Sequence, residues 1–145
     1  MTLKNLLRTG QLIEHQPSAD EIAHLLESAE RAVADSHSTD ISAETRFDAA
    51  YRAIMQAATA ALWASGYRTS TSSPGHHRTT IQALTLTVGL EAGRTAVLDR
   101  LRHKRNLIDY RGEGIDPTSV SECAEQARSL IDAVRASIGP LSGRT

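Results

Sequence analysis

The chain has few aromatic residues, a single cysteine and no long hydrophobic run. Aromatic residues make up only 3% of its 145 residues, whereas hydrophobic residues as a whole make up 40%. Strands favour aromatic and β-branched side chains, while alanine and leucine, which are abundant here, favour helices. The hydrophobic fraction also argues against a disordered chain. The composition therefore predicts an all-α globular protein.

The lone cysteine and the short apolar stretches bear on location. Cys123 has no second cysteine with which to form an internal disulfide, which fits a reducing compartment. No apolar run reaches the roughly 18 residues of a membrane span. The first eleven residues contain too short an apolar stretch for a signal peptide. We therefore expect a cytoplasmic protein that does not cross a membrane.

Positive and negative charges nearly balance over the chain, but one segment is strongly basic. The chain carries 16 Lys and Arg residues against 17 Asp and Glu residues, so it is not a general coat for nucleic acid. Within residues 100–112, however, five basic side chains gather: Arg100, Arg102, Lys104, Arg105 and Arg111. A local excess of positive charge in a balanced chain indicates a site for an anionic ligand.

Apolar residues recurring at intervals of three and four predict five or six helices. The expected ranges are about 3–16, with Ile13 on the apolar face, and then 19–36, 43–65, 76–88, 93–110 and 117–138. Ser18 and Ser42 are expected N-caps, Gly66 a helix stop, and Gly89 and Gly93 a break or kink. No segment shows the pattern of a strand. Short connections predict an up-down antiparallel bundle in one domain, residues 1–138, with a frayed tail at 139–145.

The basic helix presents one polar face. Arg102, Arg105, Asn106 and Asp109 are three or four residues apart, so they share that face and are the candidate ligand-binding residues. The planar fork of an arginine suits phosphate oxygens, and Asp109 is placed to orient Arg105. The alternative is a solvated helix face whose one ion pair contributes about 0.3–0.5 kcal/mol.

Two parts of the sequence resemble the HEPN superfamily (higher eukaryotes and prokaryotes nucleotide-binding). One is Arg105-Asn106 on the basic helix, and the other is AYRAIMQAATAALWASGYRTSTSSPGHHRTTIQAL at residues 50–84, with its Ala-rich helix, GYR end and GHH turn. Together, in the expected order, they cover roughly half of the chain. The similarity is to the toxin-like or substrate-binding-protein-like branch.

The resemblance implies a helical homodimer in which two signature helices meet around a shared groove. Catalytic members are metal-independent ribonucleases that use the Arg and His of the motif on the scissile phosphate. Other members are toxins paired with nucleotidyltransferase antitoxins, or non-catalytic nucleotide-binding and interaction modules. No cofactor and no metal are expected.

This sequence departs from the motif at the histidine. Four residues separate Arg105 from the expected His, and that position holds Tyr110; no His lies beyond His103. Tyrosine, with an ordinary pKa near 10, exchanges protons poorly at neutral pH, whereas histidine does so readily. Arg105, Asn106, Tyr110 and His103 remain the catalytic candidates. The tyrosine found two residues beyond the His in many family toxins is here Gly112.

The GHH turn offers another source of imidazole. His76 and His77 are adjacent, so they do not have the i,i+3 or i,i+4 spacing of a helical metal pair. Either they cap and pack, or one of them joins the Arg105 groove and replaces the missing proton-transfer group. Tyr51 and Arg52 are candidates for the groove wall. Cys123, Trp63 and Tyr67 are interpreted as packing residues.

Three functional hypotheses follow from the sequence. The first is a HEPN-like dimer that binds a nucleotide, RNA or an acidic partner through its Arg-Asn groove, without efficient ribonuclease activity. The second is a metal-independent ribonuclease toxin of a toxin–antitoxin or defence system. The third is a dimerisation bundle with no ligand. Whether the protein is an enzyme stays open at this stage.

Overall fold

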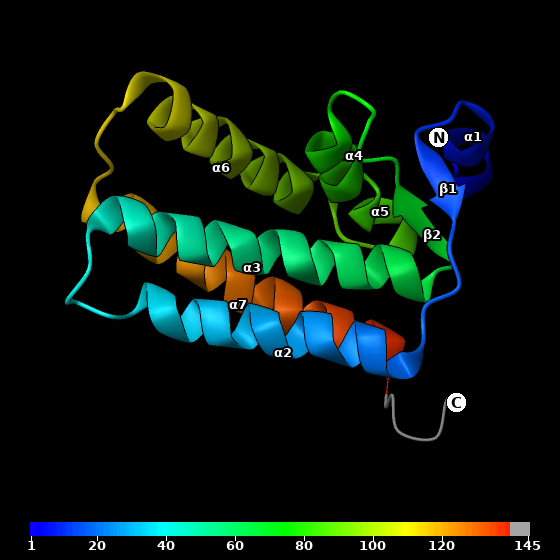
Figure 1. The fold of residues 1–145 in the computed structure, drawn as a ribbon, viewed down its shortest axis with the longest axis horizontal. Coiled ribbons are helices and arrows are strands. Elements are labelled where there is room, and N and C mark those ends of the chain that lie inside the picture. The colour runs from blue at the N-terminus through cyan, green and yellow to red at the C-terminus, as the bar shows by residue number, and fades with distance from the viewer. Residues whose placement is uncertain (140–145) are drawn as a thin grey trace.

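The computed structural model describes residues 1–139, and helices dominate it (Figure 1). The long helices are α2 (Ala19–Ser36), α3 (Ala43–Ala64), α6 (Ala92–Arg111) and α7 (Pro117–Ile138), and the short ones are α1 (Leu3–Arg8), α4 (His76–Gln82) and α5 (Leu84–Thr87). Successive long helices run in opposite directions, with α3 in the middle of the view. The predicted all-α helical bundle is confirmed.

The core forms where α3 packs between α2 and α7. Phe47 and Ile54 on α3 are fully buried, as are many alanines of the same helix. Methyl side chains let the three helix backbones approach closely, and larger residues of α2 and α7 fill the remaining space. The buried apolar residues on these two partners are Ile22, Leu26, Ala29, Ala32, Val33, Val120, Cys123, Ala124, Ala127, Leu130, Ile131, Val134 and Ile138.

The helix ends follow local sequence signals. The Oγ of Ser18 accepts a hydrogen bond from the backbone N–H of Glu21 at 3.1 Å, and the Oγ of Ser42 accepts one from Thr45 at 3.2 Å. Each bond satisfies an N–H group that the first turn of a helix leaves unpaired. Gly66, with φ of 94°, adopts the left-handed backbone that stops α3. The predicted caps and the predicted stop are confirmed.

A two-stranded antiparallel sheet corrects the expectation at the N-terminus. Strand β1 (Leu12–Glu14) pairs with β2 (Tyr67–Thr69). The prediction of a helix reaching residue 16 with Ile13 on its apolar face is wrong, because α1 ends at Arg8 and Ile13 is 37% exposed. The prediction that no segment forms a strand is also wrong, because β1 and β2 are strands. The end of α3 brings β2 beside β1, and strands of three residues are too short to show a pattern in the sequence.

The helix predicted for 76–88 is divided. It breaks at Ala83 into α4 and α5, and the expected break at Gly89 is present, with φ of 69°. The following helix, α6, buries only Leu98 and Leu101 in the core and leaves its C-terminal turns more open. It lies over α3, with α4 beside its N-terminal end, as a partly separate layer (Figure 1).

Apart from Gly139, the expected frayed tail lies outside the described residues. Within the described part of the chain, no helix is both long and apolar enough to span a bilayer.

Candidate functional site

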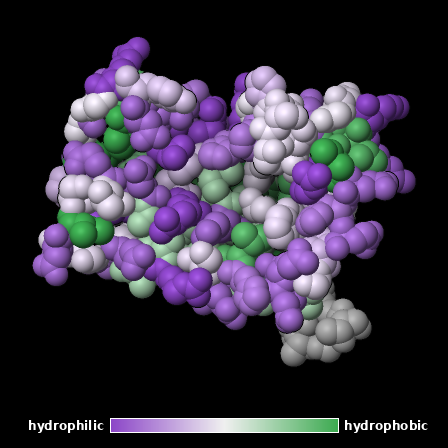
Figure 2. Space-filling model, in the orientation of Figure 1, coloured by the Kyte–Doolittle hydropathy of each residue, from purple (hydrophilic) through white to green (hydrophobic). Residues whose placement is uncertain are grey.

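An elongated groove of about 620 Å³ runs along one face of α3. The residues that α3 contributes recur every three or four positions, so they form one stripe. From Asp48 to Trp63 this stripe spans about 22 Å at the helical rise. The lining consists of Asp48, Tyr51, Arg52, Met55, Gln56, Thr59 and Trp63 from α3, with Leu25, Arg68, Thr69, Thr71, His76, His77, Thr80 and Arg105 from other segments. On the face viewed in Figure 2, hydrophobic side chains show between hydrophilic ones over the middle of the molecule.

Arg105 is held at one end of the groove by three contacts. Its Cζ lies 5.1 Å from the centre of the Tyr51 ring, within cation–π range. Its Nε lies 3.7 Å from Oδ1 of Asp48, and its Nη2 lies 3.5 Å from Oδ2 of Asp109. The predicted pairing of Arg105 with Asp109 is therefore confirmed. Because the side chain is still 34% exposed, a positioned guanidinium remains open to a ligand.

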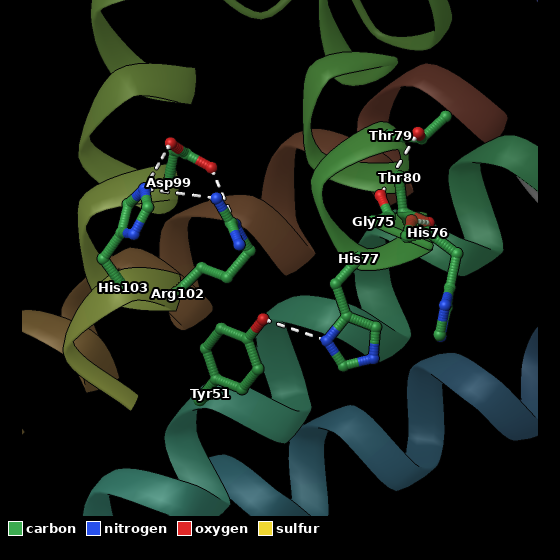
Figure 3. Close-up of polar contacts among 9 residues, drawn as sticks. All are labelled: Tyr51, Gly75, His76, His77, Thr79, Thr80, Asp99, Arg102 and His103. Atoms are coloured by element: carbon green, nitrogen blue, oxygen red, sulfur yellow. Dashed lines mark hydrogen bonds and ion pairs between the residues drawn. The ribbon is translucent and has the colours of Figure 1, made fainter. Parts of the chain in front are cut away.

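Tyr51 also links this arginine to a histidine. The hydroxyl of Tyr51 lies 3.2 Å from Nδ1 of His77 (Figure 3). Burial raises the pKa of Tyr51 to about 12, so the hydroxyl keeps its proton. Burial also lowers the pKa of His77, and the nearby His76 and Arg105 lower it further. A neutral imidazole is thus held by Tyr51 at one nitrogen, which leaves the other nitrogen for a ligand.

Both histidines of the GHH turn reach the groove. Gly75, with φ of 75°, is the N-cap of α4, and the first two residues of the helix, His76 and His77, face α3. The rings of His76 and His77 pack edge to face, with their centres 4.8 Å apart. Of the two readings left open by the sequence, the structure supports the one in which the turn contributes imidazole beside Arg105.

The groove is more cationic than anionic. Among residues 1–139, neither Arg52 nor Arg68 lies within ion-pair distance of a carboxylate. Asp48 carries the one carboxylate among the described lining residues. Burial, and secondarily Asp109, raise the pKa of Asp48, while Arg105 and Arg52 oppose the shift. An anion entering the groove therefore meets three guanidinium groups and a single carboxylate among the described lining residues.

The other residues predicted on the basic helix lie elsewhere. The Nε of Arg102 bonds Oδ1 of Asp99 at 2.8 Å, and the exposed His103 lies 3.4 Å from Oδ2 of the same carboxylate (Figure 3). Tyr110 is 86% exposed, and neither it nor Asn106 lines the groove. Of the predicted ligand-binding set, only Arg105 does so. The fold brings Asp109 against Arg105 but leaves Arg102 and Asn106 outside the groove lining.

Comparison with known proteins adds no relative. No family model, no curated protein and no solved structure matches the chain. The function is therefore argued from the groove itself.

Several residues of the groove are not predicted from the sequence. The predicted packing role of Trp63 is confirmed, since its ring packs against His15 with centres 4.6 Å apart, but Trp63 also lines the groove. Gln56 and Arg68 were not singled out, although Gln56 lies at the helical spacing from Arg52 that marks the α3 stripe. Cys123 is buried as predicted. Among residues 1–139 no three His, Cys, Asp or Glu side chains cluster as metal ligands would.

Proposed function

We propose that this chain is a HEPN-like helical protein whose groove binds a phosphate-bearing ligand, either a nucleotide or a single strand of RNA. The observation that carries the proposal is the gathering of cations in one groove. Arg105 from α6, Arg52 from α3 and Arg68 from β2 line it together with two imidazoles. These five groups come from four separate elements, α3, β2, α4 and α6, so the fold and not a local charge run assembles them.

The chemistry of the groove suits a phosphodiester. Guanidinium groups donate paired hydrogen bonds to phosphate oxygens, and an arginine already fixed by Tyr51 loses less side-chain freedom on binding. A span of about 22 Å accommodates about six stacked nucleotides at 3.4 Å each. Single-strand sites commonly combine such a charged track with aromatic side chains, and here Trp63 lies along the same groove.

The direct test is the affinity of a fluorescent single-stranded RNA hexamer, measured by anisotropy at several salt concentrations. Losing one charge-assisted contact costs about 1.5–3 kcal/mol, so Arg105→Ala should weaken binding about tenfold or more. The slope of log affinity against log salt should fall by about 0.7. Arg100→Ala is the matched control, because Arg100 lies on the same helix, pairs with Glu122 and does not line the groove. Equal effects of the two substitutions would overturn the proposal.

A second candidate, a metal-independent ribonuclease, is favoured by His77. This neutral imidazole lies in the same groove as Arg105, so a proton-transfer group and a phosphate-binding group can face one ligand. RNA cleavage in EDTA that is lost in His77→Gln but retained in His103→Gln would support it. Binding of RNA without cleavage at high protein concentration would support the binding proposal and contradict the ribonuclease.

The proposed partners rest on the HEPN resemblance. They are a second copy of the chain and an antitoxin of the nucleotidyltransferase type. If the protein neither binds nor cleaves RNA, and neither Arg105→Ala nor His77→Gln changes any measured property, the third hypothesis, a dimerisation bundle without a ligand, is favoured.

A further inference from the structure

We infer that the Trp63 end of the groove is a nucleobase subsite, so that the ligand is recognised by a base as well as by its phosphates. The inference rests on the proposed function, because it assumes that the phosphate lies at the Arg105 end. It goes further by assigning Trp63 and Gln56 a role in choosing a nucleotide over any other polyanion.

The groove changes character along α3. At the Arg105 end its wall is formed by charged and hydrogen-bonded side chains, including Asp48 and Tyr51. Towards the C-terminal end of the helix, Met55 and Trp63 contribute apolar surface beside Thr59, and Leu25 of α2 adds more. A ligand that fills the groove therefore needs one anionic part and one flat or apolar part.

Trp63 is the aromatic surface open to that second part. Tyr51 is only 2% exposed and its ring lies beneath the Arg105 guanidinium, so a base cannot stack on it. Trp63 is partly buried, and the His15 ring packs against it at an interplanar angle of 66°. The indole is thus held in one orientation. Stacking on such a fixed ring is how single-strand sites receive bases.

Gln56 supplies a polar contact beside this surface. Its Nε2 donates a hydrogen bond to Oγ of Ser28 at 2.9 Å. Its Oε1 is buried and has no hydrogen-bond partner in residues 1–139. A buried acceptor without a donor is unfavourable, so a ligand that brings an N–H group gains when the Gln56 side chain turns its Oε1 into the groove. The exocyclic amino groups of adenine, cytosine and guanine, and the ring N–H of uracil, are such donors.

Arg68 continues the charged track past this subsite. It lies on β2, directly after the Gly66 stop of α3, and lines the groove without an ion-pair partner among the described residues. A base at Trp63 would then lie on a strand whose phosphates meet Arg105 on one side and Arg68 on the other. This arrangement favours a nucleotide within a chain, while a mononucleotide would use the Arg105 contact alone.

The test compares ligands that differ only in their bases. A single-stranded adenylate hexamer and an abasic hexamer carry the same phosphates, so any difference in their affinity comes from the bases. We expect the hexamer with bases to bind at least tenfold more tightly than the abasic one. Trp63 is the single tryptophan of the chain, so its fluorescence should change with the base-bearing hexamer and stay constant with the abasic one.

The variant test uses Gln56→Leu, which keeps the volume of the side chain and removes its amide. It should reduce the base-dependent affinity ratio about threefold or more and leave the abasic hexamer unaffected. Gln82→Leu is the control, because Gln82 is exposed on α4 and does not line the groove. Circular dichroism verifies that both variants fold. Equal binding of the two hexamers overturns the subsite alone, whereas no binding of either overturns the proposed function and the subsite with it.

Discussion

The guanidinium of Arg105 lies over the ring of Tyr51, with its Cζ 5.1 Å from the ring centre. The two residues come from α6 and α3, and the hydroxyl of the same tyrosine reaches His77 on α4. Tyr51 therefore joins three helices and fixes the two groups that the proposed function needs. A change at this one side chain should act on both neighbours, but through different atoms.

Substitutions at Tyr51 should separate these two roles. Tyr51→Phe keeps the ring under Arg105 and removes the hydroxyl, so RNA binding should change less than about threefold. Tyr51→Ala removes the ring as well; a cation–π contact is worth about 0.5–2 kcal/mol, so binding should weaken about 2- to 30-fold. Anisotropy with the RNA hexamer measures both. If the phenylalanine variant binds as poorly as the alanine variant, the ring contact does not position Arg105.

The helices were predictable from sequence because each one carries its own signals. Ser18 and Ser42 cap their helices through contacts three residues away, and Gly66 stops α3 with its own backbone conformation. The Arg105–Asp109 pair was predictable for the same reason, since it lies within one turn of one helix. A contact can be predicted from residue spacing wherever both partners belong to one helix.

The groove was less predictable because its partners are distant in sequence. Tyr51 and His77 are separated by the end of α3, a strand and a loop, and no spacing rule links them. The sheet that pairs β1 with β2 also depends on how α3 places its end. Conversely, the basic cluster suggested a single polar face, yet Asp99 holds Arg102 and His103 outside the groove. Charge density in sequence identified the helix but not which arginine faces the ligand.

His77 should make folding stability depend on pH. Its pKa in the folded protein is lowered, chiefly by burial, so the unfolded chain takes up a proton first as the pH falls. Its contribution is therefore complete above the unfolded pKa of about 6.5 and is lost as the pH falls through the lower folded value. Urea unfolding should show that the free energy of unfolding decreases less between pH 7.5 and pH 5 in His77→Gln than in the wild-type protein.

The matched control for this pH effect is His37→Gln, because His37 is exposed at the end of α2 and does not line the groove. It should retain the wild-type pH dependence. A His77→Gln protein whose unfolding free energy falls as steeply as that of wild type would show that other groups carry the effect.

The close packing of α3 should make its alanines intolerant of larger side chains. Ala57 is fully buried where α3 meets the core, so Ala57→Leu adds volume for which there is no space. Overpacking of this kind costs about 1–3 kcal/mol. Urea denaturation should show this loss, while Ala64→Leu, at the exposed end of the same helix, should change stability by less than about 0.5 kcal/mol.

The proposed homodimer can be tested at the open end of α6. Leu107 and Tyr110 are exposed there, on the helix that the HEPN resemblance places at the interface. A charge buried in an interface without a partner is strongly unfavourable, so Tyr110→Asp should shift a dimer towards monomer in sedimentation equilibrium. Ile41→Asp, at an exposed residue between α2 and α3, should leave the mass unchanged. Identical masses for all three proteins would argue against an interface through Tyr110.

Cys123 should report on unfolding because it is the single thiol of the chain and lies in the core. Burial raises its pKa to about 12, so at neutral pH little of the reactive thiolate is present, and reagents cannot reach it. An unfolding free energy of at least about 5 kcal/mol implies that a thiol reagent labels the native protein at least about 10³-fold more slowly than the unfolded chain. Labelling should accelerate with urea in step with the loss of helical circular dichroism, and Ala57→Leu should accelerate it in buffer. Rapid labelling of the wild-type protein without urea would instead show that α7 opens locally from α3, and the groove on α3 would then be less rigid than the proposed function requires.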